Sequence, residues 1–276
     1  MRLHVILPDE SATMPASRLV ELAQEAETLG FAGVWLPDHV LPPAEYGPVY
    51  GGVYEPLTTL AHLAAVTTRV TLGTSVLVLP LREPLVLAKQ AATLAHLSGG
   101  RFVLGVGTGW EAYEFEAAGA DFAARGARTT EALRLVRRLH TRGGGPYADD
   151  VRSFDERAVF QPVPAAPVPF LIGGNSDAAL RRAARVGEMW QGVGLSPEEF
   201  TARRARLREL GGEHVSAGVR DHWNDDARPV GDVARRVRDW DRAGAEDLGL
   251  HFGPVEGFGR RMRTLAARVP ELLSGG

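Results

Sequence analysis

The feature that most constrains the fold is a repeated alternation of short apolar runs and amphipathic helical stretches. Short apolar runs bounded by Pro or Gly are typical of buried parallel strands. Between them apolar residues recur at helical spacing, as in the stretch that follows Ser17 and ends at Gly30. The predicted strands are 3–8, 33–37, 70–79, 101–107, 170–172, 189–193, 215–219 and 248–252, most of them followed by a helical stretch.

Eight strand-then-helix units predict an α/β fold, the (β/α)8 TIM barrel, because right-handed parallel units in this number fill about 250 residues or slightly more. We expect a single barrel domain over 1–276, with a Gly- and Pro-rich insertion at about 143–169 before the fifth strand. A doubly wound open sheet is the alternative, but it would use fewer strands for this length. In a barrel the residues just after each strand form the functional face, so these positions hold the candidate site residues.

Polar or Gly-rich turns follow three of these strands. Asp38 and His39 form a carboxylate–imidazole pair suited to acid/base work near neutral pH; a capping Asp and a packed His are the alternative. The turns 105–110 (Gly-Val-Gly-Thr-Gly-Trp) and 173–176 (Gly-Gly-Asn-Ser) let the backbone approach a flat or phosphorylated ligand. The second turn leads into a helix N-terminus, which favours a bound anion, although plain capping is the simpler alternative.

His251 ends the last strand and is expected at the same mouth of the barrel. The loop 42–54 carries Tyr46, Tyr50 and Tyr54 and is expected to be an aromatic lid or a passive loop. His4 lies early in the first strand, where a core role is expected. Cys is absent and no spaced His pair or carboxylate cluster follows the strands, so no metal site is predicted.

Charge and composition exclude several classes of partner. The net charge of −3 gives no basic face for nucleic acid. The longest uncharged run, 158–176, contains four Pro, so no membrane helix is predicted. The absence of Cys fits a reducing compartment, and the first residues do not look like a secretory signal, so a cytoplasmic location is expected.

Several segments taken together resemble the bacterial luciferase-like monooxygenase superfamily, and specifically its branch of oxidoreductases that use the deazaflavin coenzyme F420. The run 55–119 carries the likeness most clearly, and the similarity spans most of the chain and is densest over its first half. The segments that carry it are 55–60 (Glu-Pro-Leu-Thr-Thr-Leu), 72–80 (Leu-Gly-Thr-Ser-Val-Leu-Val-Leu-Pro), 88–94, 97–101, 105–110, 125–129 and 169–174.

The resemblance implies a homodimeric (β/α)8 barrel with an insertion before strand five and a cis peptide in the third strand, at Ser75–Val76, behind the deazaflavin ring. It places Asp38 and His39 beside the reactive face of the ring. His39 would be the general acid/base or a substrate-orienting group, and Asp38 would hold its tautomer or contact the ring. The further cofactor contacts that the resemblance implies are Ser75, Val76, Thr108, Gly109, Gly173, Gly174, Asn175 and Ser176.

One position departs from related sugar-phosphate dehydrogenases of this branch. They place a catalytic Glu directly after the Gly-Thr-Gly turn, where this chain has Trp110; Glu111 comes one position late and Glu114 four. The departure argues against a sugar-phosphate substrate and puts a proton donor at this strand in doubt. The predicted substrate pocket consists of Trp110, Glu111, Tyr54 and His251.

The expected function is that of an F420-dependent oxidoreductase, which transfers a hydride between the deazaflavin and a small organic substrate. The first alternative is an FMN-dependent monooxygenase of the same superfamily, which activates oxygen. The second is a barrel that binds flavin-type ligands without turnover, and the third is a cofactor-free barrel that binds phosphate.

Overall fold

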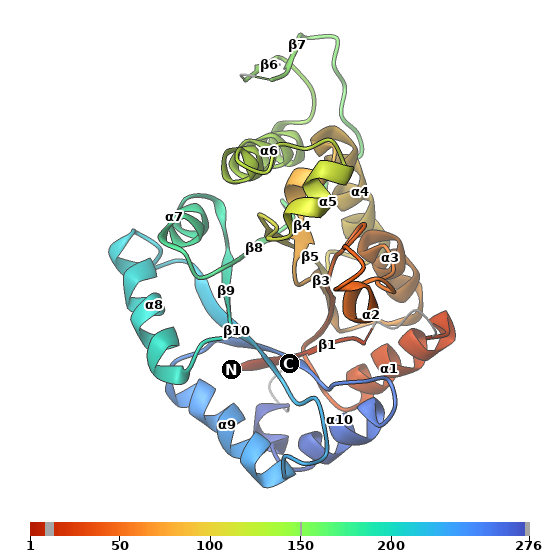
Figure 1. Cartoon of the computed structure of the whole chain (residues 1–276). Coiled ribbons are helices and arrows are strands. Elements are labelled where there is room, and N and C mark those ends of the chain that lie inside the picture. The colour runs from red at the N-terminus through yellow and green to blue at the C-terminus, as the bar shows by residue number, and fades with distance from the viewer. Residues whose placement is uncertain (9–13, 150, 274–276) are drawn as a thin grey trace.

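The computed structural model describes residues 1–8, 14–149 and 151–273, and in it parallel strands close into a barrel (Figure 1). The order around the barrel is β3-β2-β1-β11-β10-β9-β8-β5-β4, and β3 also pairs with β5, which closes the ring. This confirms the predicted TIM barrel. The strands are β1 (Arg2–Ile6), β2 (Gly33–Leu36), β3 (Thr71–Thr74), β4 (Leu77–Val78), β5 (Phe102–Gly107), β8 (Phe170–Gly173), β9 (Met189–Val193), β10 (Ser216–His222) and β11 (Asp247–His251).

The helices surround the barrel (Figure 1). The long ones are α1 (Ala16–Thr28), α3 (Pro56–Val66), α4 (Pro84–Leu97), α6 (Arg125–Arg142), α7 (Asp177–Val186), α8 (Pro197–Glu209), α9 (Val230–Arg242) and α10 (Phe258–Ala266). At the start of α8, Ser196 and Glu199 form a reciprocal capping box. The helical stretch expected after Ser17 is α1, which begins at Ala16 with Pro15 in the capping position. Among the described helices, none is both long and apolar enough to cross a membrane.

Two parts of the chain differ from the predicted alternation. The predicted strand 70–79 is broken into β3 and β4, because a cis peptide joins Ser75 and Val76 between them. The expected insertion contains a short antiparallel hairpin, β6 (Tyr147–Ala148) and β7 (Ser153–Phe154), which stands away from the barrel in Figure 1. Two short helices, α2 (Gly47–Tyr50) and α5 (Ala112–Ala117), were not predicted, and both lie in loops that follow barrel strands.

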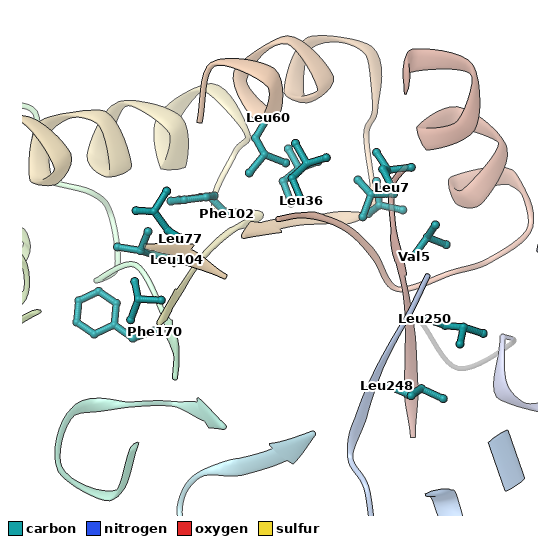
Figure 2. Packing of buried hydrophobic residues seen from close by; sticks show 14 of the residues in the cluster. Val5, Leu7, Leu36, Leu60, Leu77, Phe102, Leu104, Phe170, Leu248 and Leu250 are labelled. Atoms are coloured by element: carbon teal, nitrogen blue, oxygen red, sulfur yellow. The ribbon is translucent and has the colours of Figure 1, made fainter. Parts of the chain in front are cut away.

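The main apolar core lies between the outer faces of the strands and the helices. Val5, Leu248 and Leu250 belong to it and alternate along β1 and β11 with residues of the barrel interior (Figure 2). On the interior side, Ile6, Trp35, Leu171 and Met189 form a second, smaller cluster. Burying one large apolar side chain stabilises the fold by about 1.5–3 kcal/mol, so the two layers together fix the rigid platform on which the strand ends stand.

A buried polar cluster lies at the start of the strands, on the face opposite the candidate site. Asp247 accepts hydrogen bonds from Arg2 Nη2 at 2.8 Å and Ser216 Oγ at 2.7 Å, and His4 Nε2 lies 2.8 Å from its other oxygen. Although burial opposes it, these partners lower the pKa of Asp247 to about 2. Burial lowers the pKa of His4, which is stacked on Trp35. The expected core role of His4 is therefore confirmed.

Candidate active site

Asp38 ties the end of β2 to the chain that follows β3. Its carboxylate accepts hydrogen bonds from the Val78 amide at 2.8 Å and from Arg82 Nη2 at 2.5 Å, and Arg82 Nη1 reaches Glu55 at 2.8 Å. Burial raises the pKa of Asp38, while the Arg82 guanidinium and the Val78 amide oppose the shift. Asp38 is therefore an anchored, buried carboxylate, and its predicted contact with a cofactor ring stays a prediction.

His39 is held by a carboxylate from a distant part of the chain. Its Nδ1 lies 2.9 Å from Glu114 Oε2, and the other oxygen of Glu114 accepts the amides of Val40 at 2.7 Å and Leu41 at 3.0 Å. Glu114 belongs to α5 and is only 3% exposed. In the described part of the chain, Glu114 rather than Asp38 lies at Nδ1 of His39, so of the two roles expected for Asp38 only the contact with the ring stays a prediction.

Aromatic rings surround His39 on its outer side. Tyr50 stacks on the imidazole with ring centroids 4.3 Å apart, and Trp110 meets it edge-on at 5.9 Å. Tyr46 contacts Trp110 at 5.1 Å. We call Tyr46, Tyr50 and Trp110 the aromatic wall. Trp110 is 53% exposed, so the wall presents an apolar surface beside the partly buried imidazole of His39.

Only part of loop 42–54 contributes to the aromatic wall. Tyr46 and Tyr50 lie in the wall, and residues 47–50 form α2. Tyr54 donates instead to the Met14 carbonyl at 2.7 Å, and its ring makes no contact with the wall among the described residues. Glu111 caps α5 by accepting the Tyr113 amide at 3.0 Å. Both residues keep their predicted place in the substrate pocket as predictions only.

The cis peptide expected at Ser75–Val76 is present. Ser75 Oγ donates to Gln191 Oε1 at 2.7 Å, and Arg220 Nη1 donates to the Ser75 carbonyl at 2.8 Å. Val76 lies against bare backbone, since a Cβ at Gly107 or Gly173 would come within 2.7 and 2.9 Å of its side chain. The lack of a side chain at Gly107 and Gly173, at the ends of β5 and β8, therefore leaves room for Val76 in the bulge between β3 and β4.

The turn after β5 also requires glycine. Gly109 has a φ of +76°, and a Cβ there would lie 2.7 Å from the Phe115 ring and 2.8 Å from Val78. Thr108, just before it, is half-buried. The turn thus brings Trp110 and the start of α5 over the end of β5, which is how Glu114 reaches His39.

The turn after β8 leads into α7, as predicted, and Ser176 is the residue that caps this helix. The Asn175 side chain makes two hydrogen bonds with the backbone of Val193. Its Nδ2 donates to the Val193 carbonyl at 2.7 Å, and its Oδ1 accepts from the Val193 amide at 3.1 Å. Arg203 and Arg206 of α8 pair with Asp177 in the first turn of α7 at 2.9 and 3.0 Å, and Arg203 also donates to the Asn175 carbonyl. Positive charge thus gathers at this helix N-terminus.

His251 ends β11 as predicted, and its imidazole is largely enclosed. Its Nδ1 accepts the Gly253 amide at 3.2 Å, and its ring meets Phe258 edge-on at 5.8 Å. Burial first, and then the Arg220 charge, lower the pKa of His251 to about 3. His251 is therefore neutral at neutral pH, and its predicted part in a substrate pocket stays a prediction.

Four polar residues that the sequence analysis did not select also stand at this face. Arg82 and Glu114 hold the Asp38–His39 pair, and Gln191 and Arg220 hold the cis peptide. A pattern existed for the last two, because Gln191 lies two residues after Met189 and Arg220 two residues after Gly218. Each pair therefore lies on the same face of its strand. No local pattern marks Glu114 as a partner of His39, which lies 75 residues away.

Comparison with known proteins assigns the chain to a family. The model of the luciferase-like monooxygenase family matches residues 1–244. The chain belongs to this family. The resemblance stated from the sequence is thereby confirmed, and the chain is an oxidoreductase of the luciferase-like family.

Among relatives of this luciferase-like protein, an uncharacterized protein of Mycobacterium tuberculosis is 38% identical over 212 residues, which cover 70% of this chain and 72% of the relative. An F420-dependent glucose-6-phosphate dehydrogenase of Kineococcus radiotolerans is 35% identical over 175 residues, 62% of this chain and 50% of the relative. A solved F420-dependent secondary alcohol dehydrogenase, in complex with an F420–acetone adduct, superposes with a TM-score of 0.82. That match covers 97% of this chain and 98% of the other at 16% identity, so it supports the fold.

Proposed function

We propose that the protein is an F420-dependent oxidoreductase that transfers a hydride between the deazaflavin and a small organic substrate. The observation that carries the proposal is the position of the Glu114-held His39 at the end of β2, next to the cis peptide. The Ser75 amide donates to the Leu36 carbonyl at 2.7 Å and the Val78 amide to Asp38, so β2 and the bulge run side by side up to His39.

The residues present fit a flat ring at this place. Val76 and the bare backbone of Gly107 and Gly173 make a smooth surface at the centre of the strand ends. The aromatic wall and His39 stand on the β2 side. A planar tricyclic ring requires such close backbone approach on one side and a proton-handling group on the other.

The residues also fit an anionic tail. The α7 N-terminus and the side chains of Arg203 and Arg206 lie together after β8, and both arginines pair there with Asp177. Helix amides and guanidinium groups are suited to phosphate and carboxylate oxygens. Asn175 supports this turn through Val193, so we assign it to holding the turn in shape.

The bound deazaflavin would supply the hydride chemistry, and the protein would orient the reactants, exclude water and handle the proton. His39 gives or takes the proton that accompanies hydride exchange on the substrate. The aromatic wall shields this proton from bulk water, and Asp38 with Arg82 keeps the β2 end in place. The absence of a Glu directly after Gly109, where Trp110 stands, is why we expect no sugar-phosphate substrate.

An FMN-dependent monooxygenase stays the alternative function, because the matching family model is named for luciferase-like monooxygenases. The ring of FMN also has the same flat tricyclic shape as the deazaflavin. A homodimer and a cytoplasmic location, both expected from the sequence, also stay predictions.

Turnover under controlled oxygen separates the two functions. Anaerobically, we expect the protein to change the visible absorbance of F420 with one or more members of a panel of secondary alcohols, ketones and enones. We expect no oxygen uptake above the protein-free rate when it is supplied with reduced FMN. Oxygen uptake with reduced FMN, together with no F420 turnover across the panel, would contradict the proposal and favour the monooxygenase.

A further inference from the structure

The hydrogen bonds of Glu114 determine which nitrogen of His39 carries a proton. Among the described residues Glu114 has three partners, and two of them are the backbone amides of Val40 and Leu41, which can only donate and both donate to Oε1. Glu114 Oε2 then faces His39 Nδ1 at 2.9 Å. A carboxylate that already accepts two amides is best satisfied as an acceptor at its other oxygen, so the proton of this hydrogen bond belongs to Nδ1.

From this geometry we propose that Glu114 is a positioning residue, which holds His39 with a proton on Nδ1 and presents Nε2 to the reacting atoms. The inference rests on the proposed function for its catalytic meaning. In the described part of the chain Nδ1 has a hydrogen-bond partner, and no described group occupies Nε2. The Tyr50 ring covers one face of the imidazole and prevents it from turning over easily.

The arrangement does for His39 what a buried carboxylate does for a catalytic imidazole in general. It fixes the tautomer and the ring orientation, and it stabilises the positive charge that appears when Nε2 takes a proton. The proton thus moves between the substrate and Nε2, while the Nδ1 proton stays in its bond to Glu114. Glu114 itself touches neither substrate nor cofactor.

The test uses Glu114→Gln, with Glu116→Gln as the matched control, because Glu116 is an exposed carboxylate on the same helix. The Gln oxygen can still accept the amides of Val40 and Leu41, but its NH2 group then faces Nδ1 and can only donate. The variant therefore favours the opposite tautomer, with the proton on Nε2. Retained secondary structure and thermal stability would show that the variant folds.

Nitrogen NMR of the full chain without cofactor reads the tautomer directly. The His39 signals are those lost in His39→Asn, one of eight histidines in the chain. We expect the proton on Nδ1 in the wild type and in Glu116→Gln, and on Nε2 in Glu114→Gln. A wild-type spectrum with the proton on Nε2, or an unchanged tautomer in a folded Glu114→Gln, would overturn the inference even if the enzyme turns over F420.

Kinetics supply the second measurement. For Glu114→Gln we expect kcat to fall roughly 100-fold, with the Kd for F420 within about threefold of the wild type and with a changed pH profile of kcat. Glu116→Gln should match the wild type. Equal losses of kcat in both variants would contradict the positioning role. The expected NMR result in a protein that turns over no F420 would support Glu114 as the holder of His39 and contradict the proposed function.

Discussion

Replacing His39 by Asn is expected to lower kcat by roughly 10²–10⁴-fold, the usual contribution of a general acid or base. The Asn amide can still donate to Glu114, so the α5 contact and the fold are retained. What is lost is the nitrogen that exchanges a proton with the substrate. We expect the Kd for F420 to change by no more than about threefold, since His39 is assigned to the proton and not to holding the ring.

The measurement is steady-state turnover of F420 with the best substrate of the panel, combined with equilibrium binding of F420. His62→Asn is the matched control, because His62 is an exposed histidine on α3. It should behave as the wild type in both measurements. A folded His39→Asn protein with wild-type kcat would show that His39 takes no part in the chemistry. A much higher Kd for F420 with unchanged kcat would show that His39 serves binding instead.

Replacing Asp247 by Ala is expected to destabilise the protein by about 3–5 kcal/mol at pH 7, the usual cost of removing one partner from a buried polar pair. Asp247 is 2% exposed and joins His4, Arg2 and Ser216 at the start of the barrel strands. Its loss leaves those groups without their acceptor. Asp232→Ala is the control, because Asp232 is a half-exposed carboxylate of α9 paired with Arg235, and such surface pairs contribute about 0–1 kcal/mol.

The pH dependence of the free energy of unfolding gives a second test of the Asp247 interactions. The folded-state pKa of Asp247 is about 2, below its usual 3.8, so the folded protein favours the charged form. The stabilisation is present above about pH 4 and is lost as the pH falls towards 2, and it amounts to about 2 kcal/mol. Urea unfolding across this range should show this component in the wild type and not in Asp247→Ala. Equal acid sensitivity of both proteins would contradict the assignment.

The local pattern was sufficient to predict most of the framework. Strand and helix positions follow from apolar periodicity, and the barrel follows from counting their alternation. The break between β3 and β4 does not follow from periodicity, because 70–79 is one uncharged run rich in β-branched residues and a cis peptide leaves no mark in the pattern. It was expected only from the family resemblance. The β6–β7 hairpin was missed because two-residue strands in a Pro-rich insertion give no alternation.

The candidate site was predictable in its strand-end residues and not in the contacts between them. Asp38 and His39 could be placed by the rule that barrel sites follow the strands. The choice of Glu114 over Asp38 as the partner of His39 depends on how the Gly109 turn directs α5, which is a tertiary effect. Likewise, Arg203 reaches the Asn175 turn from α8, the next helix along the chain, which no local pattern indicates. Arg182 of α7 is bound instead to Thr130 and Gly126 of α6.

The most direct test of the central claim is an equilibrium titration of the purified protein with F420 and with FMN, followed by fluorescence. We expect F420 to bind at least about tenfold more tightly, a difference of about 1.4 kcal/mol, because its longer anionic tail reaches the positive charge at the start of α7. FMN binding as tightly as F420, or more tightly, would contradict the proposal that F420 is the cofactor.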